Sequence, residues 1–395
     1  MEKRNEALRK ATLLIGSTLT VMAGAIIAPA LPQISREFSD VPGVELLSRL
    51  VLTLPALFMG ILAPLAGYLT DRAGRKKVLL FSLILYAIAG TTGLYFDDLI
   101  WILAGRAVLG IAVGGLITAI ITLIGDYFEG ESRSRFMGMQ AAFAGMGGLI
   151  FISMGGVLAD INWRMPFLLY VVSLVVWFMA MISVYEPERT KKIKDENRDQ
   201  TITGKNKFDK IPTIVFIVYG VTFISALVFY MIPVQMPFML SEMEGITNTK
   251  IGFAIAFVNV ASVTTSLNYG RIRRKLSFPA IMAIVYFLVF VGFMIISRSN
   301  SYIMMIVGVI FSGLGFGLML PNINLWLISL APDSRRGQLV GYLNMALFLG
   351  MFGSPIVIQP LVAYADLYFT FFLVSIMLIM MAVVFGIYTL RKRSK

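Results

Sequence analysis

The chain has 395 residues and contains neither cysteine nor histidine. Without cysteine it has no disulfide framework, no thiolate metal ligand and no cysteine nucleophile. Without histidine it lacks imidazole acid–base chemistry and the commonest metal ligand. Paired carboxylates at the centre of a hydrophobic run are missing as well, so the sequence offers no catalytic constellation. We expect no enzyme activity, no metal site and no cofactor.

Charge is also scarce, because only 14% of the residues are charged and 58% are hydrophobic. An ordinary soluble domain has about 25% charged residues. The mean hydropathy of +0.82 points the same way. A soluble chain of this length could not cover its surface with so few charges, which indicates an all-α membrane protein.

Apolar stretches recur along the whole chain, and a membrane-spanning helix needs about 20 such residues. Reading them between charged or turn-rich breaks predicts twelve transmembrane helices. Their expected centres are Met22, Leu57, Ile88, Val113, Met146, Val175, Ser225, Val260, Val289, Gly315, Phe348 and Met380. The polar stretch 186–210 separates two sets of six. We therefore predict a six-helix bundle over residues 1–185, a cytoplasmic linker over 186–210 and a second six-helix bundle over 211–395.

The net charge of +12 comes from Lys and Arg residues that are unequally divided between the two sides of the membrane. With both termini placed inside, the inner loops, the linker and the tails hold most of the Lys and Arg. The exceptions are Arg36, Arg49, Arg106, Arg164, Lys250 and Arg298. Such a bias follows the positive-inside rule. It predicts a multi-pass protein of the cell membrane with both termini in the cytoplasm, and it explains the basic charge without a nucleic-acid partner.

The two halves also echo each other at an offset of about 200 residues, as an internal repeat does. Gly67-Tyr-Leu-Thr-Asp-Arg-Ala-Gly-Arg-Lys-Lys77 follows the second span, and Gly270-Arg-Ile-Arg-Arg-Lys275 follows the eighth. Glu131-Ser-Arg133 and Asp333-Ser-Arg335 form a second matched pair. Repeated six-helix halves are an architecture of secondary transporters, with the solute site between them at the midplane.

The stretch 67–77 resembles the loop signature of the major facilitator superfamily, which follows its second helix. Arg106 in Ala-Gly-Arg-Ala-Val-Leu-Gly110 and Asp126 at the end of the fourth span extend the resemblance. The stretches 321–326 and 350–355 are similar to the drug:proton antiporter branch. That branch carries Gly-Pro-x-x-Gly-Gly late in its fifth helix, whereas this chain keeps only the paired Gly155-Gly156. The direction of transport therefore stays open.

The resemblance implies two pseudo-symmetric six-helix bundles that move a small molecule by alternating access. It favours proton-coupled efflux of lipophilic or amphipathic compounds, by a monomer in the bilayer with protons as the coupling ion. A proton-coupled uptake symporter for a metabolite is the alternative within the same class. A non-transporting membrane sensor is the alternative from another class, and it would need neither the repeat nor the charged loop.

Four residues form a predicted conformational latch: Gly67, Asp71, Arg75 and Asp126. Gly67 permits close helix approach. In the resembled family the carboxylate at Asp71 meets the start of the eleventh helix, here near Gly337, where the helix dipole is positive. Arg75 and Asp126 lie at adjacent inner helix ends, and a charge-assisted pair between them could hold the two bundles together. We expect that pair to part when the inner side opens.

Arg106 is the basic residue that the sequence places well inside the membrane, where a charge is costly. It could snorkel to the outer interface, meet an outer carboxylate or an anionic solute, or bond the backbone. Proline removes N–H donors and leaves carbonyls free. Because Pro29 and Pro32 do this in the first helix, we predict that Arg106 points inward and bonds carbonyls there, with a coupling or cavity role.

No Asp or Glu falls near the middle of a predicted span, so the sequence does not identify the residue that binds the coupling ion. Central polar side chains predict an uncharged substrate cavity between the halves. Amides and hydroxyls also hold membrane helices together, which is the alternative for each of them. The predicted cavity residues are Tyr230, Gln235, Asn259, Ser262, Asn322, Asn324 and Asn344.

Overall fold

A computed structural model describes residues 2–187, 212–332 and 335–393. Of the predicted linker 186–210, only Glu186 and Pro187 belong to the described residues. The regular structure within the described ranges is helical. It contains twelve segments that are long and apolar enough to cross a membrane, which confirms the predicted number of spans.

The N-terminal half forms six spans. The first combines α1, η1 and α2, and the sixth combines η3 and α7. The elements are α1 (Glu2–Ala25), η1 (Ala28–Ala30), α2 (Leu31–Glu37), α3 (Val44–Ala73), α4 (Arg75–Gly90), η2 (Thr91–Leu94), α5 (Leu99–Tyr127), α6 (Gly130–Ile161), η3 (Met165–Val171) and α7 (Val172–Ser183).

The C-terminal half forms the other six spans, one helix to each. These helices are α9 (Ile214–Ser241), α10 (Asn248–Lys275), α11 (Phe278–Ile296), α12 (Tyr302–Leu330), α13 (Arg336–Tyr364) and α14 (Leu367–Arg393).

Helix ends follow local sequence signals. Asp98, Thr247, Ser277 and Ser301 each accept a hydrogen bond from a backbone N–H in the first turn of the helix that follows. These bonds satisfy amides that have no partner within the helix. Gly74 joins α3 to α4 with a φ of 103°, a conformation that a residue with a Cβ rarely adopts.

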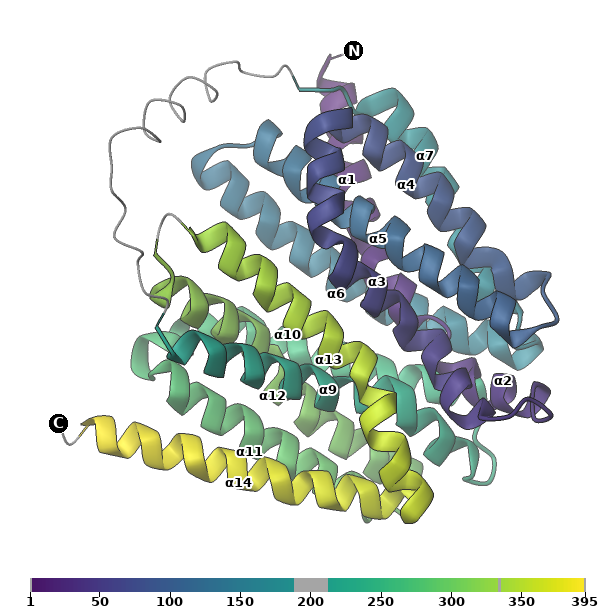
Figure 1. Ribbon diagram of the computed structural model, residues 1–395, viewed down its shortest axis with the longest axis vertical. Coiled ribbons are helices and arrows are strands. Elements are labelled where there is room, and N and C mark those ends of the chain that lie inside the picture. Colours follow the sequence, from purple (N-terminus) through teal and green to yellow (C-terminus); the bar gives the residue numbers. More distant parts are fainter. Residues whose placement is uncertain (1, 188–211, 333–334, 394–395) are drawn as a thin grey trace.

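Each half has its own hydrophobic core. One core is built from residues of α1 to α7, and the other almost entirely from residues of α9 to α14. Figure 1 shows the two halves as separate bundles whose helices are inclined to each other and converge near α2. The two predicted six-helix bundles are therefore the units of the fold.

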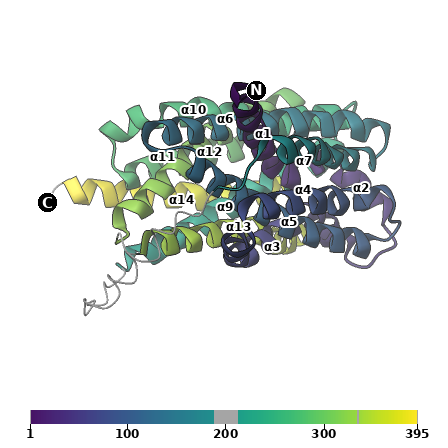
Figure 2. The same ribbon diagram turned by 90° about the horizontal axis from the view of Figure 1, so that it is seen from above.

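The bundles meet along two seams, one where α3 packs on α13 and one where α6 packs on α10. Figure 2 shows α6 and α10 near one edge of the molecule and α3 and α13 near the opposite edge. Large apolar side chains also cover the outer surface, with Ile161, Leu267 and Ile303 each more than 70% exposed. Such a surface is expected where the neighbouring medium is lipid.

Candidate transport pathway

The side of the molecule at which α7 ends and α9 begins is called the linker side, and the opposite side the far side. On the α3–α13 seam, a side chain at Gly60 would touch Phe348. Nearer the linker side, no described residue lies within 4 Å of a side chain built at Gly67, Gly337 or Gly341. The two helices therefore diverge toward the linker side.

The two helices of the α6–α10 seam also diverge toward the linker side. A side chain at Gly156 would collide with the backbone of Asn248, and one at Gly145 would just touch Val263. Closer to the linker side, a side chain at Gly138 would have no neighbour within 4 Å among the described ranges. Small residues let the far halves of these helices approach closely. The structure is therefore closed on the far side and open on the linker side.

Polar contacts between α3 and the other bundle close the first seam at the far side. The Arg49 Nε donates to Gln235 Oε1 at 2.8 Å, and the Arg49 guanidinium lies 3.9 Å from the centre of the Phe238 ring. Gln359 Nε2 donates to Glu45 Oε2 at 2.9 Å. Each amide also has one buried atom, Gln235 Nε2 and Gln359 Oε1, that bonds no described residue.

A carboxylate closes the second seam. Asp160, at the end of α6, accepts hydrogen bonds from the backbone N–H groups of Asn248 at 2.7 Å and Thr249 at 3.0 Å, and from the Thr249 hydroxyl. Asn248 and Thr249 begin α10, so a carboxylate of one bundle caps a helix of the other. Both the free amides and the helix dipole favour a negative charge at this position.

A cavity of about 310 Å³ lies between the bundles, behind this closure. Residues of α1, α3, α5, α6, α9, α10, α12 and α13 line it, and none of them is charged. Its polar side chains are Thr20, Tyr230 and Asn259. The Thr20 hydroxyl donates to the carbonyl of Ser17, whereas Tyr230 and Asn259 have no side-chain hydrogen bond among the described residues. The cavity thus offers two free polar groups on an apolar wall.

The cavity continues toward the linker side along α10. An adjoining pocket of about 200 Å³ shares Phe229, Asn259, Leu320 and Met351 with it and extends to Ser262 and Ser266. These serines follow Asn259 on α10, which runs from the far side to the linker side. A solute could therefore reach the central cavity from the linker side in this conformation.

The predicted cavity residues separate into two groups. Tyr230 and Asn259 line the central cavity, and Ser262 lines the adjoining pocket while its hydroxyl donates to Gly313 at 3.0 Å. Gln235 is fully buried in the far-side closure instead, where its amide meets Arg49. It therefore does not face solute in this conformation.

The three other asparagines lie outside both pockets, contrary to expectation. Asn322 is buried inside the second bundle, donating to Phe278 and accepting from Tyr269. Asn324 donates to the Leu320 carbonyl of its own helix, and Asn344 is exposed on α13. An uncharged amide can be satisfied by a nearby backbone carbonyl, so depth in the membrane alone did not place these side chains in the cavity.

The expected ion pair between Arg75 and Asp126 is present, with 3.1 Å between Arg75 Nε and Asp126 Oδ2. However, α4 and α5 belong to the same bundle, so the pair does not hold the two bundles together as predicted. It is also intact although the linker side is open, whereas we expected it to part. The backbone N–H groups of Arg75 and Lys76 donate to Glu186, each at 2.8 Å. These contacts fix the Gly74 turn within the first bundle.

Gly67 and Asp71 lie on the face of α3 that points to the empty part of the α3–α13 seam. Asp71 is exposed and has no hydrogen bond or ion pair among the described residues. At its expected partner, the start of α13, none of the residues that the structure describes lies within 4 Å of a side chain built at Gly337. The described conformation is therefore one in which this contact is not made.

Arg106 is fully buried, but its partners are not the predicted carbonyls near Pro29 and Pro32. It donates to the Tyr170 hydroxyl at 2.8 Å and to the Gly90 carbonyl at 3.1 Å. Its guanidinium also lies 4.7 Å from the ring centre of Phe167 and 4.8 Å from that of Tyr170. Aromatic faces stabilise a desolvated cation, which explains how the charge is tolerated without a carboxylate.

Arg106 reaches the first helix only indirectly, because the Tyr170 hydroxyl donates to the Ala23 carbonyl at 3.1 Å. It does not line the central cavity.

The far-side residues Glu45, Arg49 and Asp160 were missed as site residues. The signal available in the sequence was that Arg49, like Arg106, is a charge within a span.

Comparison with known proteins supports the architecture. The sequence profile of the Major Facilitator Superfamily matches residues 13–355 and, in a second match, residues 218–395. The chain is 22% identical over 365 residues to the bacillibactin exporter of Bacillus subtilis, covering 87% of each chain. It is 24% identical over 356 residues to a multi-drug resistance efflux pump PmrA homolog of Lactococcus lactis, covering 89% of this chain and 87% of the relative.

A solved structure has the same fold. The crystal structure of a bacterial homolog of the human lysosomal transporter Spinster, in an inward-facing and occupied conformation, matches with a TM-score of 0.78. The match covers 98% of this chain and 97% of the other, at 15% identity.

Proposed function

Because the chain belongs to the major facilitator superfamily and is a multi-pass secondary transporter, not an enzyme, we propose that it exports lipophilic or amphipathic small molecules in exchange for protons. The relatives that match over most of their length include a bacillibactin exporter and a multi-drug resistance efflux pump homolog, which supports export. The proton as exchanged ion rests on the resemblance of the 67–77 and 321–326 stretches to the drug:proton antiporter branch.

The observation that carries the proposal is the uncharged central cavity. Its wall is apolar apart from Thr20 and the free polar groups of Tyr230 and Asn259. Ligand pockets of this size and character bury most of an apolar molecule and orient it through a few polar contacts. A charged metabolite would lose its hydration there without gaining an ionic partner, which is unfavourable. This argues against the uptake of a charged metabolite.

We place the linker side in the cytoplasm, because most Lys and Arg lie on that side. The described conformation would then load solute from the cytoplasm or the inner leaflet. Solute release needs the opposite conformation. The linker-side halves of α3 and α13 would close around Gly67 and Asp71, while the contacts of Arg49, Glu45 and Asp160 at the far side break.

Flux into proteoliposomes under an imposed pH gradient tests the proposal. Purified full-length protein is reconstituted, and uptake of a lipophilic dye, a neutral apolar drug and a charged metabolite is followed. Antiport predicts that the dye or the drug accumulates only when the lumen is acidic, and that nigericin abolishes the accumulation. Accumulation with an acidic exterior would instead indicate symport and overturn the direction proposed here. Absence of flux for every apolar probe would overturn the substrate class.

Two matched substitutions test the cavity. Tyr230→Phe removes a free hydroxyl from the cavity wall. Tyr269→Phe, the control, removes a hydroxyl that donates to Asn322 and lies outside the cavity. We expect Tyr230→Phe to raise KM for polar-headed solutes by about tenfold, the value of one lost hydrogen bond. Tyr269→Phe should leave KM unchanged. Equal effects of the two substitutions would show that the cavity hydroxyl does not contact solute.

A further inference from the structure

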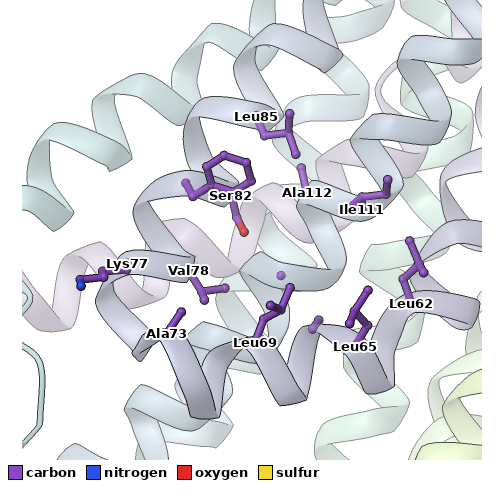
Figure 3. Close-up of a pocket in the computed structure, with 13 residues that line it drawn as sticks. Leu62, Leu65, Leu69, Ala73, Lys77, Val78, Ser82, Leu85, Ile111 and Ala112 are labelled. Carbon is purple, nitrogen blue, oxygen red and sulfur yellow. The ribbon is translucent and has the colours of Figure 1, made fainter.

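An apolar groove opens on the outer surface of the first bundle, between α3 and α4, with α5 at its base (Figure 3). Its volume is about 290 Å³. Leu62, Leu65 and Leu69 line one wall, and the second wall includes Val78, Phe81 and Leu85. Figure 3 shows the three leucines of the first wall along the length of the groove and Lys77 at its linker-side end. The groove therefore follows the lengths of α3 and α4 and ends at the Lys77 ammonium group.

A second pocket, of about 520 Å³, meets the groove at that end. The two share Ala73 and Lys77, and Arg72, Lys76 and Glu186 also line the second pocket. Together, the two pockets form one long groove. Its walls are apolar, and basic side chains surround its linker-side end, which we call the mouth.

Most of the charges at the mouth already have partners. Arg72 donates to the Tyr68 hydroxyl at 2.6 Å, and Lys76 donates to the Met181 carbonyl at 3.0 Å. The Glu186 carboxylate accepts the backbone N–H groups of Arg75 and Lys76. Lys77 is exposed and has no hydrogen bond or ion pair among the described residues. It is the cation available to a ligand in the groove.

The groove is not a seat for α13 in another transport conformation. Gly60, Gly67 and Asp71 are spaced by seven and four residues, so they share the α3 face that points to α13. The groove residues Leu62, Leu69 and Ala73 fall on the opposite face of the same helix. Movement of α13 toward α3 therefore leaves the groove open to lipid.

We propose that this groove binds an anionic phospholipid, with an acyl chain along α3 and α4 and the phosphate at Lys77. The hydrocarbon wall matches an acyl chain, and the basic mouth lies at the membrane surface that we assign to the cytoplasm. Basic pockets between transmembrane helices on that side bind anionic headgroups. The side assignment is part of the proposed topology, but the binding site does not depend on which solute is transported.

Native mass spectrometry of the purified full-length protein tests the site, with phosphatidylglycerol as probe and phosphatidylcholine as reference. Two variants remove different parts of it: Lys77→Ala removes the free cation, and Leu69→Trp fills the groove. Lys275→Ala is the control, because it removes an exposed linker-side cation at the end of α10, away from the groove.

We expect the affinity for phosphatidylglycerol to fall by about threefold or more in both groove variants, because one loses a headgroup contact and the other loses the acyl site. The Lys275→Ala variant and inorganic phosphate at millimolar concentration should leave lipid binding unchanged. Equal retention in all variants would overturn the proposal. Loss in Lys77→Ala with full retention in Leu69→Trp would show headgroup adsorption without a groove site, and would overturn it too. As the folding control, each variant should unfold at the same Tm as the wild-type protein.

Discussion

Two buried arginines show how a charge is accommodated inside the membrane without an ion pair to a carboxylate among the described residues. Arg106 is surrounded by the Phe167 and Tyr170 rings and bonds two oxygens within its own bundle. Arg49 uses the ring of Phe238 and the amide of Gln235, both of which belong to the other bundle. The same chemistry therefore stabilises one bundle at Arg106 and joins two bundles at Arg49.

We expect Arg106→Lys to destabilise the first bundle. Lysine keeps the charge, but a single ammonium cannot reach the Tyr170 hydroxyl and the Gly90 carbonyl with the planar fork of arginine. One lost charged hydrogen bond in a buried site costs about 1.5–3 kcal/mol. Thermal unfolding in detergent should show a clear fall in Tm, and flux should fall with it. Tyr170→Phe, which removes the accepting hydroxyl, should give a smaller shift in the same direction. An unchanged Tm in Arg106→Lys would show that the fork is dispensable.

At the scale of helices, the ends of α6 and α3 carry comparable carboxylates. Asp160 ends α6 and caps α10 at the far side, where the bundles touch. Asp71 lies near the end of α3 on the linker side and has no hydrogen bond or ion pair with any residue that the structure describes. Each is placed to meet the N-terminus of a helix in the other bundle. One contact is made in the described state, and we propose that the other is made in the opposite state.

Asp160→Asn should shift the protein away from the described conformation. The amide keeps the shape but loses the charge that the start of α10 favours, at a cost of about 1–2 kcal/mol. The ratio of linker-side-open to linker-side-closed molecules should then fall about tenfold. Because the chain has no cysteine, spin labels at Met139→Cys and Leu267→Cys report the linker-side opening by pulsed EPR without background.

The control for Asp160 is Asp97→Asn. Asp97 also lies at the far side, but it pairs with Arg164 of its own bundle. Its loss should leave the label distance distribution unchanged. If both substitutions gave the same distribution as wild type, the α6–α10 cap would not contribute to closure.

Asp71→Asn should act in the opposite direction. In the described state the Asp71 side chain has no partner within the part of the chain that the structure describes, so its neutralisation breaks no described contact. In the linker-side-closed state the lost helix-dipole contact costs about 0.5–1 kcal/mol. The same label pair should therefore show a larger linker-side-open population, and Asp71→Asn combined with Asp160→Asn should return toward wild type. A shift of Asp71→Asn toward the closed state would contradict this assignment.

For the whole molecule, the two seams and the central cavity act together. The far side is closed by Arg49, Glu45 and Asp160 while the linker side is open beside Gly67 and Gly138. The cavity lies between these ends. Alternating access then requires the bundles to rock about their middle, so that one end opens as the other closes.

The orientation of the molecule in the membrane is a separate prediction. We expect the linker side to face the cytoplasm, because Lys and Arg resist translocation. Fusions of a cytoplasm-active reporter and a periplasm-active reporter after Lys395 measure this directly. Activity of the cytoplasmic reporter alone is expected. Activity of the external reporter alone would invert the topology and, with it, the proposed direction of solute loading.

The sequence by itself determined the membrane class, the twelve spans and the repeat of two six-helix halves. Hydrocarbon admits a long apolar helix and excludes charge, so composition along the chain is enough to find spans. The proximity of Arg75 and Asp126 was also predictable, since both lie at neighbouring ends of consecutive spans. The predicted role of the pair between the bundles was wrong, because both helices belong to the first bundle.

Tertiary structure alone decided which side chains face the pathway. A membrane helix such as α12 or α13 is apolar on nearly every side, so periodicity does not tell which face meets the other bundle. Asn322 and Asn344 therefore looked like Asn259 in the sequence, but only Asn259 reaches the cavity. The partners of Arg106 and Arg49 come from distant segments, η3 and α9, and packing of whole helices brought them together. Contacts between remote segments depend on how the helices rotate and cross, which local sequence does not encode.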